Sequence, residues 1–328
     1  MNRRRLWICL ILVGLTVATG VAALCAGELS FTLVDIWKAA MGTAGKVPDL
    51  ILSRIRFPRA VAAWTAGAAL GLGGALMQAV TRNRLASPDI LGVNDGAMFL
   101  VIAMTLFSVV PRVGNWQIAT LGALGAFGLL LLFTKGLGKN GYRILVVGIG
   151  ISHLFRALNE LLLSRGQIQH ATEVYVWSLG SFVGRGYASA FPAWLGLMCC
   201  VPVALAIARQ LNILGLSEEV AYTLGVPVPR VKFMALALAV LVTGLGLSVG
   251  GPLAFIALAS PVLMYRLNRS RDLSVMGSLL AGGLLVLAGD TLGRILLAPV
   301  ELPVGIVCRI LGGVFLLVLL SSSAQENE

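Results

Sequence analysis

Long apolar runs, each bounded by short polar or glycine- and proline-containing segments, recur along the whole sequence. A helix needs roughly 20 apolar residues to cross the hydrocarbon core of a bilayer. By that measure the pattern predicts about ten crossings, of which the eighth is short and begins near Gly251-Pro252. Helices interrupted near glycine and proline often form the working part of a transporter. The predicted crossings are 6–26, 60–80, 91–111, 116–134, 144–164, 191–209, 233–250, 252–267, 274–293 and 304–321.

The composition supports this interpretation, because 58% of the 328 residues are hydrophobic and only 12% are charged. A soluble globular chain carries about 25% charged residues. The sequence therefore predicts an all-α integral membrane protein, with residues 1–328 forming a single transmembrane domain. The apolar run after Arg3-Arg4-Arg5 is long enough to span a bilayer, and we interpret it as an uncleaved first helix rather than a secretory signal.

The distribution of basic residues predicts that both ends of the chain lie in the cytoplasm (N-in, C-in). With this orientation the cytoplasmic segments hold 14 of the 25 lysines and arginines, and the outer segments hold nine. Basic residues favour the cytoplasmic side of membrane proteins. We therefore attribute the net charge of +11 to membrane topology rather than to nucleic-acid binding.

Three outer arginines, Arg54, Arg56 and Arg59, lie within six residues, and the positive-inside rule does not explain them. Arginine binds carboxylates through two N–H groups, so this cluster suits an acidic partner protein or an anionic substrate. The alternative is that the side chains extend to lipid phosphates, and their spacing does not separate the two. Asp290 and Arg294 are four residues apart near the outer end of the ninth crossing, where a local salt bridge and a partner contact are equally compatible with the sequence.

Two short helices are predicted outside the membrane. In the outer segment, Ser30 or Thr32 is suited to cap a helix that has Asp35 in its first turn. In the inner segment, Ser217 is suited to cap a helix that ends at Gly225, before two prolines. A short structured helix in a cytoplasmic loop is typical of a docking element.

The fifth crossing is the most polar, since His153, Arg156, Asn159 and Glu160 lie within eight residues. Charged groups inside a membrane are costly unless they face protein or water. We interpret the four residues as one stripe along a water-filled pathway, with Arg156 and Glu160 as neighbours at i,i+4. The alternative is a structural ion pair that holds two helices together.

Several catalytic and cofactor motifs are absent from the sequence. It contains no GxxxxGKS/T phosphate loop, no HExxH motif and no CxxC pair, and its five cysteines lie in or beside apolar runs. We therefore predict no catalytic residue, no metal site and no cofactor. Two stretches, 73–88 and 250–266, share a start of small residues and an Ala-Ser-Pro sequence, which fits either a chance match or an internal repeat.

The stretch 54–97, RIRFPRAVAAWTAGAALGLGGALMQAVTRNRLASPDILGVNDGA, resembles the signature of the iron-siderophore and vitamin B12 (FecCD-type) family of ABC importer permeases. That signature runs R-x-P-R, then G-A-x-L-x-x-x-G-A-x-x-Q, then R-N-P-L-A-x-P-x-x-L-G. Further matches at 214–232, 250–267 and 288–320 follow in the family's order. The segments 255–258 and 301–305 look closest to the ferric-enterobactin type of permease.

The resemblance implies a type II ABC importer permease fold in the bacterial cytoplasmic (inner) membrane. It also implies four kinds of partner: ABC ATPase subunits that hydrolyse ATP, a periplasmic substrate-binding protein, a second permease subunit (a sister or a second copy), and a ferric siderophore as cargo. By position, Arg56, Arg59 and Arg294 match the family arginines that meet acidic residues of the binding protein.

Other matched positions lie on the cytoplasmic side or along the pathway. The segment 211–232 matches the family's ATPase-coupling segment, and the segment 177–184 matches the place where the outer end of the fifth crossing bends over the pathway. The resemblance assigns ATPase coupling to Ser217, Glu218, Glu219 and Gly225, and the inner gate to Asn140 and Tyr142.

The chain departs from the family pattern at two cytoplasmic positions. Arg84 stands where the family has the proline of R-N-P-L, and Val262 stands where it has the histidine of P-H-x-x-R. Both departures fit one half of a heterodimer or an altered fit to the ATPase. The residues also leave room for other functions, namely a proton-coupled secondary transporter that uses His153, Arg156 and Glu160, an importer of haem or cobalamin, or a structural or signalling subunit.

Overall fold

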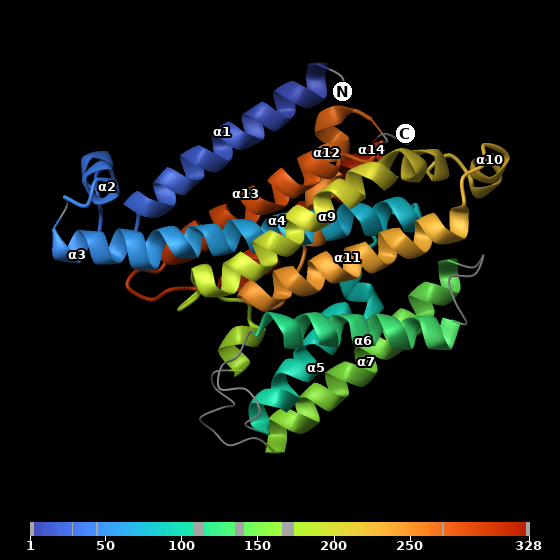
Figure 1. Cartoon of the computed structure of the whole chain (residues 1–328), viewed down its shortest axis with the longest axis horizontal. Helices are drawn as coiled ribbons and strands as arrows, with labels where there is room; N and C mark the ends of the chain where they lie inside the picture. Colours follow the sequence, from blue (N-terminus) through green and yellow to red (C-terminus); the bar gives the residue numbers. More distant parts are fainter. Residues whose placement is uncertain are drawn as a thin grey trace.

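The structure, a computed structural model, describes residues 3–27, 29–43, 45–107, 115–134, 141–165, 174–270 and 272–325, and these residues form helices and connecting segments without a strand. Each of the ten predicted crossings corresponds to one helix (Figure 1). These helices are α1 (Arg3–Cys25), α4 (Phe57–Thr81), α5 (Val93–Leu106), α6 (Trp116–Thr134), α7 (Gly141–Arg165), α9 (Tyr187–Leu214), α11 (Val228–Gly250), α12 (Ile256–Asn268), α13 (Val275–Ile295) and α14 (Val304–Gln325).

Short elements connect the long helices in the part of the chain that the structure describes. On one side lie α2 (Leu33–Ala40), α3 (Lys46–Asp49) and the π-helical turn η1 (Leu50–Arg56), which continues into α4. The 3₁₀ turn η2 (Pro88–Leu91) precedes α5, and α10 (Glu218–Thr223) joins α9 to α11. The predicted cap of α2 is confirmed at Thr32, whose side chain accepts a hydrogen bond from the backbone N–H of Asp35 while the Asp35 carboxylate accepts one from the N–H of Thr32.

Seven helices of the described chain are long and apolar enough to cross a membrane, and α5 is a shorter apolar helix. At 1.5 Å per residue the 14 residues of α5 and the 13 of α12 extend about 20 Å each, less than the roughly 30 Å of a hydrocarbon core. Each follows a break in the α-helical chain, at 82–92, which includes η2, and at 251–255 respectively. The predicted interruption at the eighth crossing is therefore confirmed, and the third crossing has a similar form.

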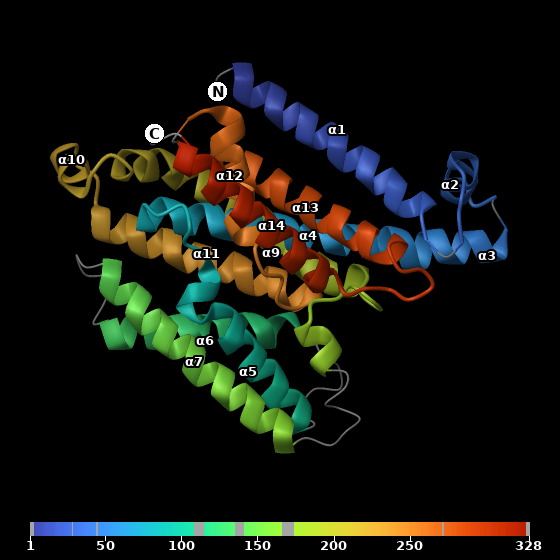
Figure 2. The ribbon, with the colours of Figure 1, turned by 180° about the vertical axis from the view of Figure 1, so that it is seen from behind.

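The long helices form two layers. Helix α4 lies in the middle of the larger layer and packs against α9, α11, α12 and α13, while α5, α6 and α7 form a second layer against α11 (Figures 1 and 2). Both termini lie at the end of the bundle that carries α10, and α2 and α3 lie at the opposite end (Figures 1 and 2). This arrangement agrees with the predicted topology, in which the termini and the α10 segment share one side.

Small residues allow α4 to approach its neighbours closely. A side chain at Gly67 or Gly71 would collide with the backbone of α13 at Gly282 and Ser278, and one at Gly74 would collide with the backbone of α12 at Ala257. Close backbone approach of this kind stabilises helix pairs in lipid, where hydrophobicity does not drive association. The glycine-rich sequence of α4 is therefore what makes it the central helix.

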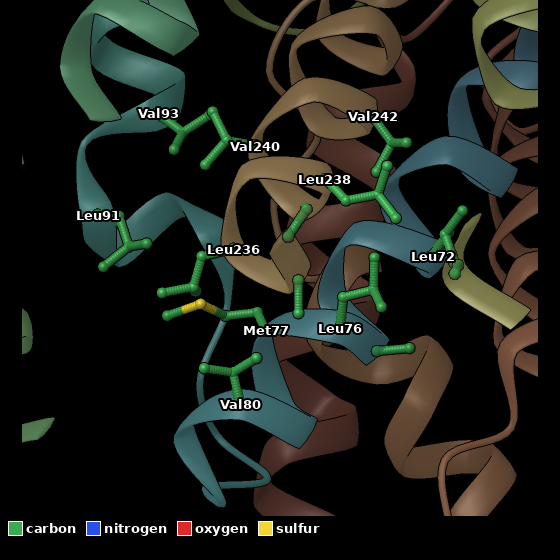
Figure 3. Packing of buried hydrophobic residues seen from close by; sticks show 14 of the residues in the cluster. Leu72, Leu76, Met77, Val80, Leu91, Val93, Leu236, Leu238, Val240 and Val242 are labelled. Carbon is green, nitrogen blue, oxygen red and sulfur yellow. The ribbon is translucent and has the colours of Figure 1, made fainter. Parts of the chain in front are cut away.

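Larger apolar side chains fill the space between α4, α11 and the second layer. Leu76 and Met77 of α4 are fully buried, as is Leu91 of η2 (Figure 3). In the same cluster α4 also contributes Leu72 and Val80, α5 contributes Val93, and α11 contributes Leu236, Leu238, Val240 and Val242 (Figure 3). This core joins the end of α4 to the start of α5, so the two layers form one packed unit.

The two Ala-Ser-Pro stretches do not have the same structure, so the proposed repeat is wrong at this level. In 73–88 the paired glycines lie inside α4 and the Ala-Ser-Pro sequence lies in the following turn. In 250–266 the paired glycines end α11 and the Ala-Ser-Pro sequence lies inside α12. The sequence similarity of the two stretches reflects the requirement for small residues at close helix contacts.

Candidate functional site

A buried ion network occupies the outer end of the bundle, at the start of α4 and the end of α13. Arg59 donates from Nε to both carboxylate oxygens of Asp290, at 3.2 and 3.1 Å, and from Nη2 to Oδ1 at 2.9 Å. Its remaining nitrogen, Nη1, donates to Oε2 of Glu301 at 2.8 Å. Arg294 Nε lies 3.5 Å from Asp290 Oδ2, so the i,i+4 pair expected from the sequence is formed.

Two outer arginines also bind the end of α1. Arg56 donates from Nη1 to the carbonyl oxygens of Leu24 and Cys25, at 2.6 and 3.2 Å, and lies over the ring of Phe31. Arg294 donates from Nη2 to the carbonyl oxygen of Ala23 at 3.0 Å. The last carbonyls of a helix lack partners within it and carry partial negative charge. The two guanidinium groups therefore hold the first crossing against the rest of the bundle.

The three arginines predicted to contact a binding protein are buried in the isolated chain. Arg56 and Arg59 are each 8% exposed and Arg294 is 6% exposed. Their guanidinium groups bind protein carbonyls and carboxylates rather than projecting into open solvent. Direct docking through them stays a prediction, and it requires a partner that reaches this network. Arg54, which lies one turn before Arg59 in the sequence cluster, is exposed.

The opposite end of the bundle carries α10, and its predicted cap is confirmed. Ser217 Oγ accepts a hydrogen bond of 3.0 Å from the backbone N–H of Val220. Gly225, just beyond the helix, has a φ of +75°, a conformation that glycine adopts without strain. Glu219 is exposed, whereas Glu218 accepts hydrogen bonds through Oε1 from Lys232 Nζ at 2.6 Å and Arg82 Nη2 at 3.4 Å. Glu218 therefore connects α10 to the end of α4 and the first turns of α11.

The surface of α10 and its flanks is apolar and exposed. Leu216 is 72% exposed, Leu224 is 62% exposed, and Val220 and Tyr222 are also exposed. The helix projects from the end of the bundle beyond α9 and α11 (Figure 1). Exposed apolar side chains grouped on one short element are typical of a site for protein contact. The structure thus agrees with a docking element here, although the partner itself is a prediction.

A cavity of about 460 Å³ lies beside this surface. It is enclosed by the turn after α4, the end of α9 and the connection between α12 and α13, and its lining includes Arg82, Arg84, Tyr265 and Asn212. Arg84 lies over the ring of Tyr265, with its guanidinium carbon 5.4 Å from the ring centroid. The cavity combines basic, amide and aromatic groups at the cytoplasmic end.

The two departures from the family pattern lie close to this cavity or in the adjoining core. The turn without its proline is fixed by Asn83, whose Oδ1 accepts a hydrogen bond of 2.9 Å from the N–H of Leu85, and Arg82 adopts φ +53°. Arg84 stabilises the turn from outside through Tyr265. Val262 is 4% exposed within α12, so an apolar side chain fits its surroundings.

The polar residues of α7 do not lie on one stripe, so that part of the prediction is wrong. His153, Arg156 and Glu160 are exposed, but Asn159 is 4% exposed and donates to the carbonyl oxygen of Asp95 at 3.1 Å. Successive helical residues are about 100° apart, so the two neighbours Asn159 and Glu160 face different sides. Arg156 Nη2 lies 3.8 Å from Asp95 Oδ2, so its ion pair joins α7 to α5 rather than forming along α7.

The pathway prediction for the three exposed residues of α7 stays a prediction. Of the two gate candidates, Asn140 lies outside the described residues, and for Tyr142 the structure describes only the backbone at the beginning of α7. The segment 177–184 is described. The N–H of Ser181 donates to the carbonyl oxygen of Gly250 at 2.8 Å, and the N–H of Gly305 donates to that of Gly180 at 3.0 Å. This segment therefore joins the outer ends of α11 and α14.

The sequence reasoning missed Asp89, which lies in the turn between α4 and α5. Its Oδ1 atom is buried and has no hydrogen-bond partner. Burial raises the pKa of the Asp89 carboxyl to about 6, against an ordinary value of 3.8. The sequence places it in the turn after the second crossing, and the packing of η2 against α7 and α5 encloses it.

These features define a class of protein: a multi-pass helical membrane protein with a short capped helix that exposes apolar side chains on the side of its termini. The chain belongs to the FecCD transport family, whose model matches residues 15–322. The resemblance seen in the sequence is thereby confirmed.

Two curated relatives and one solved structure show how far the likeness extends. The chain is 32% identical over 328 residues to the ferric enterobactin transport system permease protein FepG of Escherichia coli (strain K12), covering 100% of this chain and 99% of that protein. It is 31% identical over 308 residues to the hemin transport system permease protein HmuU of Yersinia pestis, covering 92% and 91%. It also shares its fold with an inward-facing structure of the metal-chelate type of ABC transporter, with a TM-score of 0.84, 24% identity, and coverage of 97% and 99%.

Proposed function

We propose that this chain is the permease subunit of an ATP-driven importer that moves ferric siderophore chelates from the periplasm to the cytoplasm across the bacterial inner membrane. The observation that carries the proposal is the likeness to FepG, which extends over 100% of this chain and 99% of that protein. The protein FepG is named for ferric enterobactin transport. The likeness therefore includes the predicted docking segments as well as the membrane helices.

On the cytoplasmic side, ABC ATPase subunits bind α10 and the adjacent cavity, and they hydrolyse the ATP. The exposed apolar surface of α10 supports this role, as do the ion pairs of Glu218. Movement of α10 would pass through Arg82 to α4 and through Lys232 to α11. These helices belong to one packed core, so a rigid shift at α10 would change the outer end as well.

On the outer side, a periplasmic binding protein delivers the chelate and docks near Arg56, Arg59 and Arg294. A second permease subunit, either a sister or a second copy, completes the pathway. We assign the exposed groups of His153, Arg156 and Glu160 to that shared pathway, and Asn140 and Tyr142 to its inner gate. A bulky chelate requires a wide cavity between two subunits, so most of the specificity resides in the binding protein.

The test is uptake of ⁵⁵Fe-labelled ferric enterobactin by vesicles that contain this chain, the ATPase, the binding protein and any sister permease. We expect uptake that requires ATP and stops when the ATPase carries an inactivating change in its phosphate loop. Continued uptake with the inactive ATPase would contradict an ATP-driven mechanism. If an uncoupler abolishes uptake while ATP is held constant, the proton-coupled alternative is supported instead.

A second cargo class, haem, is favoured by the 31% identity to HmuU, which is named for hemin transport. Haem and cobalamin are therefore added as competitors in the same vesicles, each delivered with its own binding protein. Inhibition of ⁵⁵Fe uptake by only the siderophore complex supports the siderophore assignment. Transport of haem at a rate equal to or above that of the siderophore complex would replace it.

A further inference from the structure

Arg59 has two carboxylate partners in very different environments. Asp290 is 2% exposed and binds Nε and Nη2 of the guanidinium group, so it neutralises Arg59 inside the bundle. The side chain of Glu301 is 43% exposed and binds only Nη1, at 2.8 Å. Solvent and partner proteins can reach the Glu301 carboxylate, but Asp290 is inaccessible.

Glu301 lies in the outer connection between α13 and α14, residues 296–303. Two backbone hydrogen bonds order this connection, from Leu302 N–H to the carbonyl oxygen of Gly293 at 3.0 Å and from Val300 N–H to that of Leu297 at 2.9 Å. The same connection exposes three large apolar side chains, Leu296, Leu297 and Val300. An exposed carboxylate and an exposed apolar surface therefore lie together above Arg59.

The two carboxylates differ in how readily a competitor displaces them. The Glu301 carboxylate is 43% exposed, so water can solvate it when it leaves Arg59, whereas removing Asp290, whose side chain is 2% exposed, leaves unpaired charges in a medium of low polarity. A carboxylate from a docking protein can take the place of Glu301 on Nη1 without changing the charge next to Arg59. Displacing Asp290 would leave both Arg59 and Arg294 without their buried counterion.

We propose that Glu301 is a displaceable internal partner, which occupies on Arg59 the position that an acidic side chain of the docking protein takes when it binds. This inference rests on the proposed function, in which a binding protein docks at the outer end. Asp290 remains in place during the exchange and keeps the guanidinium group oriented. The exposed apolar side chains of residues 296–303 then contact the docked protein as Glu301 moves away.

The experiment measures the Kd of the binding protein for the complete transporter in nanodiscs. The probe is the binding protein that is required for uptake by this transporter, loaded with ferric enterobactin. Glu301→Gln keeps the shape of the side chain but removes its charge, so it competes less well for Arg59. We expect the Kd to fall about 2- to 5-fold, the effect of losing an exposed ion pair as competitor.

A matched control removes the same charge elsewhere on the outer side. Asp35→Asn in α2 neutralises another outer carboxylate, one that binds Thr32 rather than Arg59, and it should leave the Kd unchanged. In an Arg59→Lys background, Glu301→Gln should lower the Kd by a smaller factor. The reason is that a lysine ammonium does not present two separate N–H edges to two carboxylates. Thermal unfolding of each purified variant confirms that it remains folded.

The outcomes separate this inference from the proposed function. A Kd that is unchanged or higher in Glu301→Gln overturns the inference, as does an equal decrease in Asp35→Asn or an undiminished gain in the Arg59→Lys background. If wild-type transporter binds no binding protein and takes up its cargo without one, the proposed function fails instead. Tight wild-type binding with no gain in Glu301→Gln leaves the function standing and removes only the role of Glu301.

Discussion

The two ends of the helix bundle each pair arginines with carboxylates, but the outer Arg59–Asp290 pair is buried and the cytoplasmic Arg82–Glu218 pair is partly exposed. At the outer end, Asp290 and Arg59 are 2% and 9% exposed in their side chains. At the cytoplasmic end, Glu218 and Arg82 are 23% and 42% exposed. An arginine–carboxylate pair thus holds two long helices together at the outer end, whereas at the cytoplasmic end it joins the projecting helix α10 to the bundle. The degree of burial distinguishes these two roles, because it sets the free energy that is lost when one partner of the pair is removed.

The largest expected effect comes from the buried outer pair. Asp290→Ala leaves Arg59 and Arg294 without their buried counterion, so we expect a loss of about 3–5 kcal/mol in the free energy of unfolding. The measurement is thermal or denaturant unfolding of the purified chain in detergent. The control is Asp272→Ala at the cytoplasmic end, whose pair with Arg5 is more exposed and whose loss should cost below about 1 kcal/mol. Equal losses in the two variants would contradict the comparison.

Asp89, whose Oδ1 atom is buried without a hydrogen-bond partner, is an exception near the cytoplasmic end, and its removal should stabilise the protein. Because the folded-state pKa of about 6 lies above the ordinary 3.8, the folded chain holds the proton more tightly. This group's contribution to stability is therefore full at pH values below 3.8 and is lost as the pH rises to about 6.

Asp89→Asn replaces the carboxyl with an amide that does not ionise, so the variant does not lose stability as the pH rises. We expect the variant to match the wild type near pH 4 and to exceed its free energy of unfolding above pH 6 by about 3 kcal/mol. Unfolding curves of both proteins across this pH range provide the measurement. A stability difference that does not vary with pH would contradict the prediction, because it would show that folding does not raise the pKa of the Asp89 carboxyl.

Glu218 at the accessible cytoplasmic end should affect coupling more than stability. Glu218→Gln weakens the connections of α10 to Arg82 and Lys232, so we expect the free energy of unfolding to fall by at most about 1 kcal/mol. ATP-driven uptake should fall roughly fivefold or more, because α10 no longer moves rigidly with α4 and α11. Asp35→Asn in α2, at the opposite end of the bundle, serves as the control that removes a carboxylate outside the coupling segment. Wild-type uptake in Glu218→Gln would remove this residue from the coupling path.

The smallest effect is expected at the pair of Arg84 and Tyr265. Arg84→Ala removes an exposed contact between a guanidinium group and an aromatic ring, which contributes about 0.5 kcal/mol. Tyr265→Phe keeps the ring and should preserve the contact, while Tyr265→Leu should reproduce the loss. A double-mutant cycle with Arg84→Ala measures the interaction directly. An interaction energy of zero between Arg84 and Tyr265 would mean that Asn83 alone fixes the turn.

Much of the fold was predictable because membrane crossing imposes a strong local pattern. Apolar length located all ten helices, and capping chemistry located the starts of α2 at Thr32 and of α10 at Ser217. The interruption before α12 followed from Gly251-Pro252. Each of these signals depends on residues that are near one another in the sequence, so no knowledge of packing was needed.

The candidate sites were only partly predictable. The sequence located Asp290 and Arg294 as neighbours. It did not show that Arg59, which lies 231 residues from Asp290 in the chain, is the partner of Asp290. It grouped Asn159 with the exposed residues of α7, and it gave no sign that Asp89 is enclosed. Charge partners on different helices depend on which faces meet, and helix-to-helix contacts leave no local pattern in a membrane helix whose lipid-facing and packed sides are both apolar.

The sequence by itself therefore determined the class of fold, the family, the positions of the long helices along the chain and the places where polar groups interrupt apolar runs. Only the tertiary structure decided which of those polar groups are buried partners and which face outward. It separated Asp290 from Glu301 as the fixed and the accessible partner of Arg59. The physical reason is that hydrophobic length is a property of one segment, whereas the environment of a charge is a property of every segment packed around it.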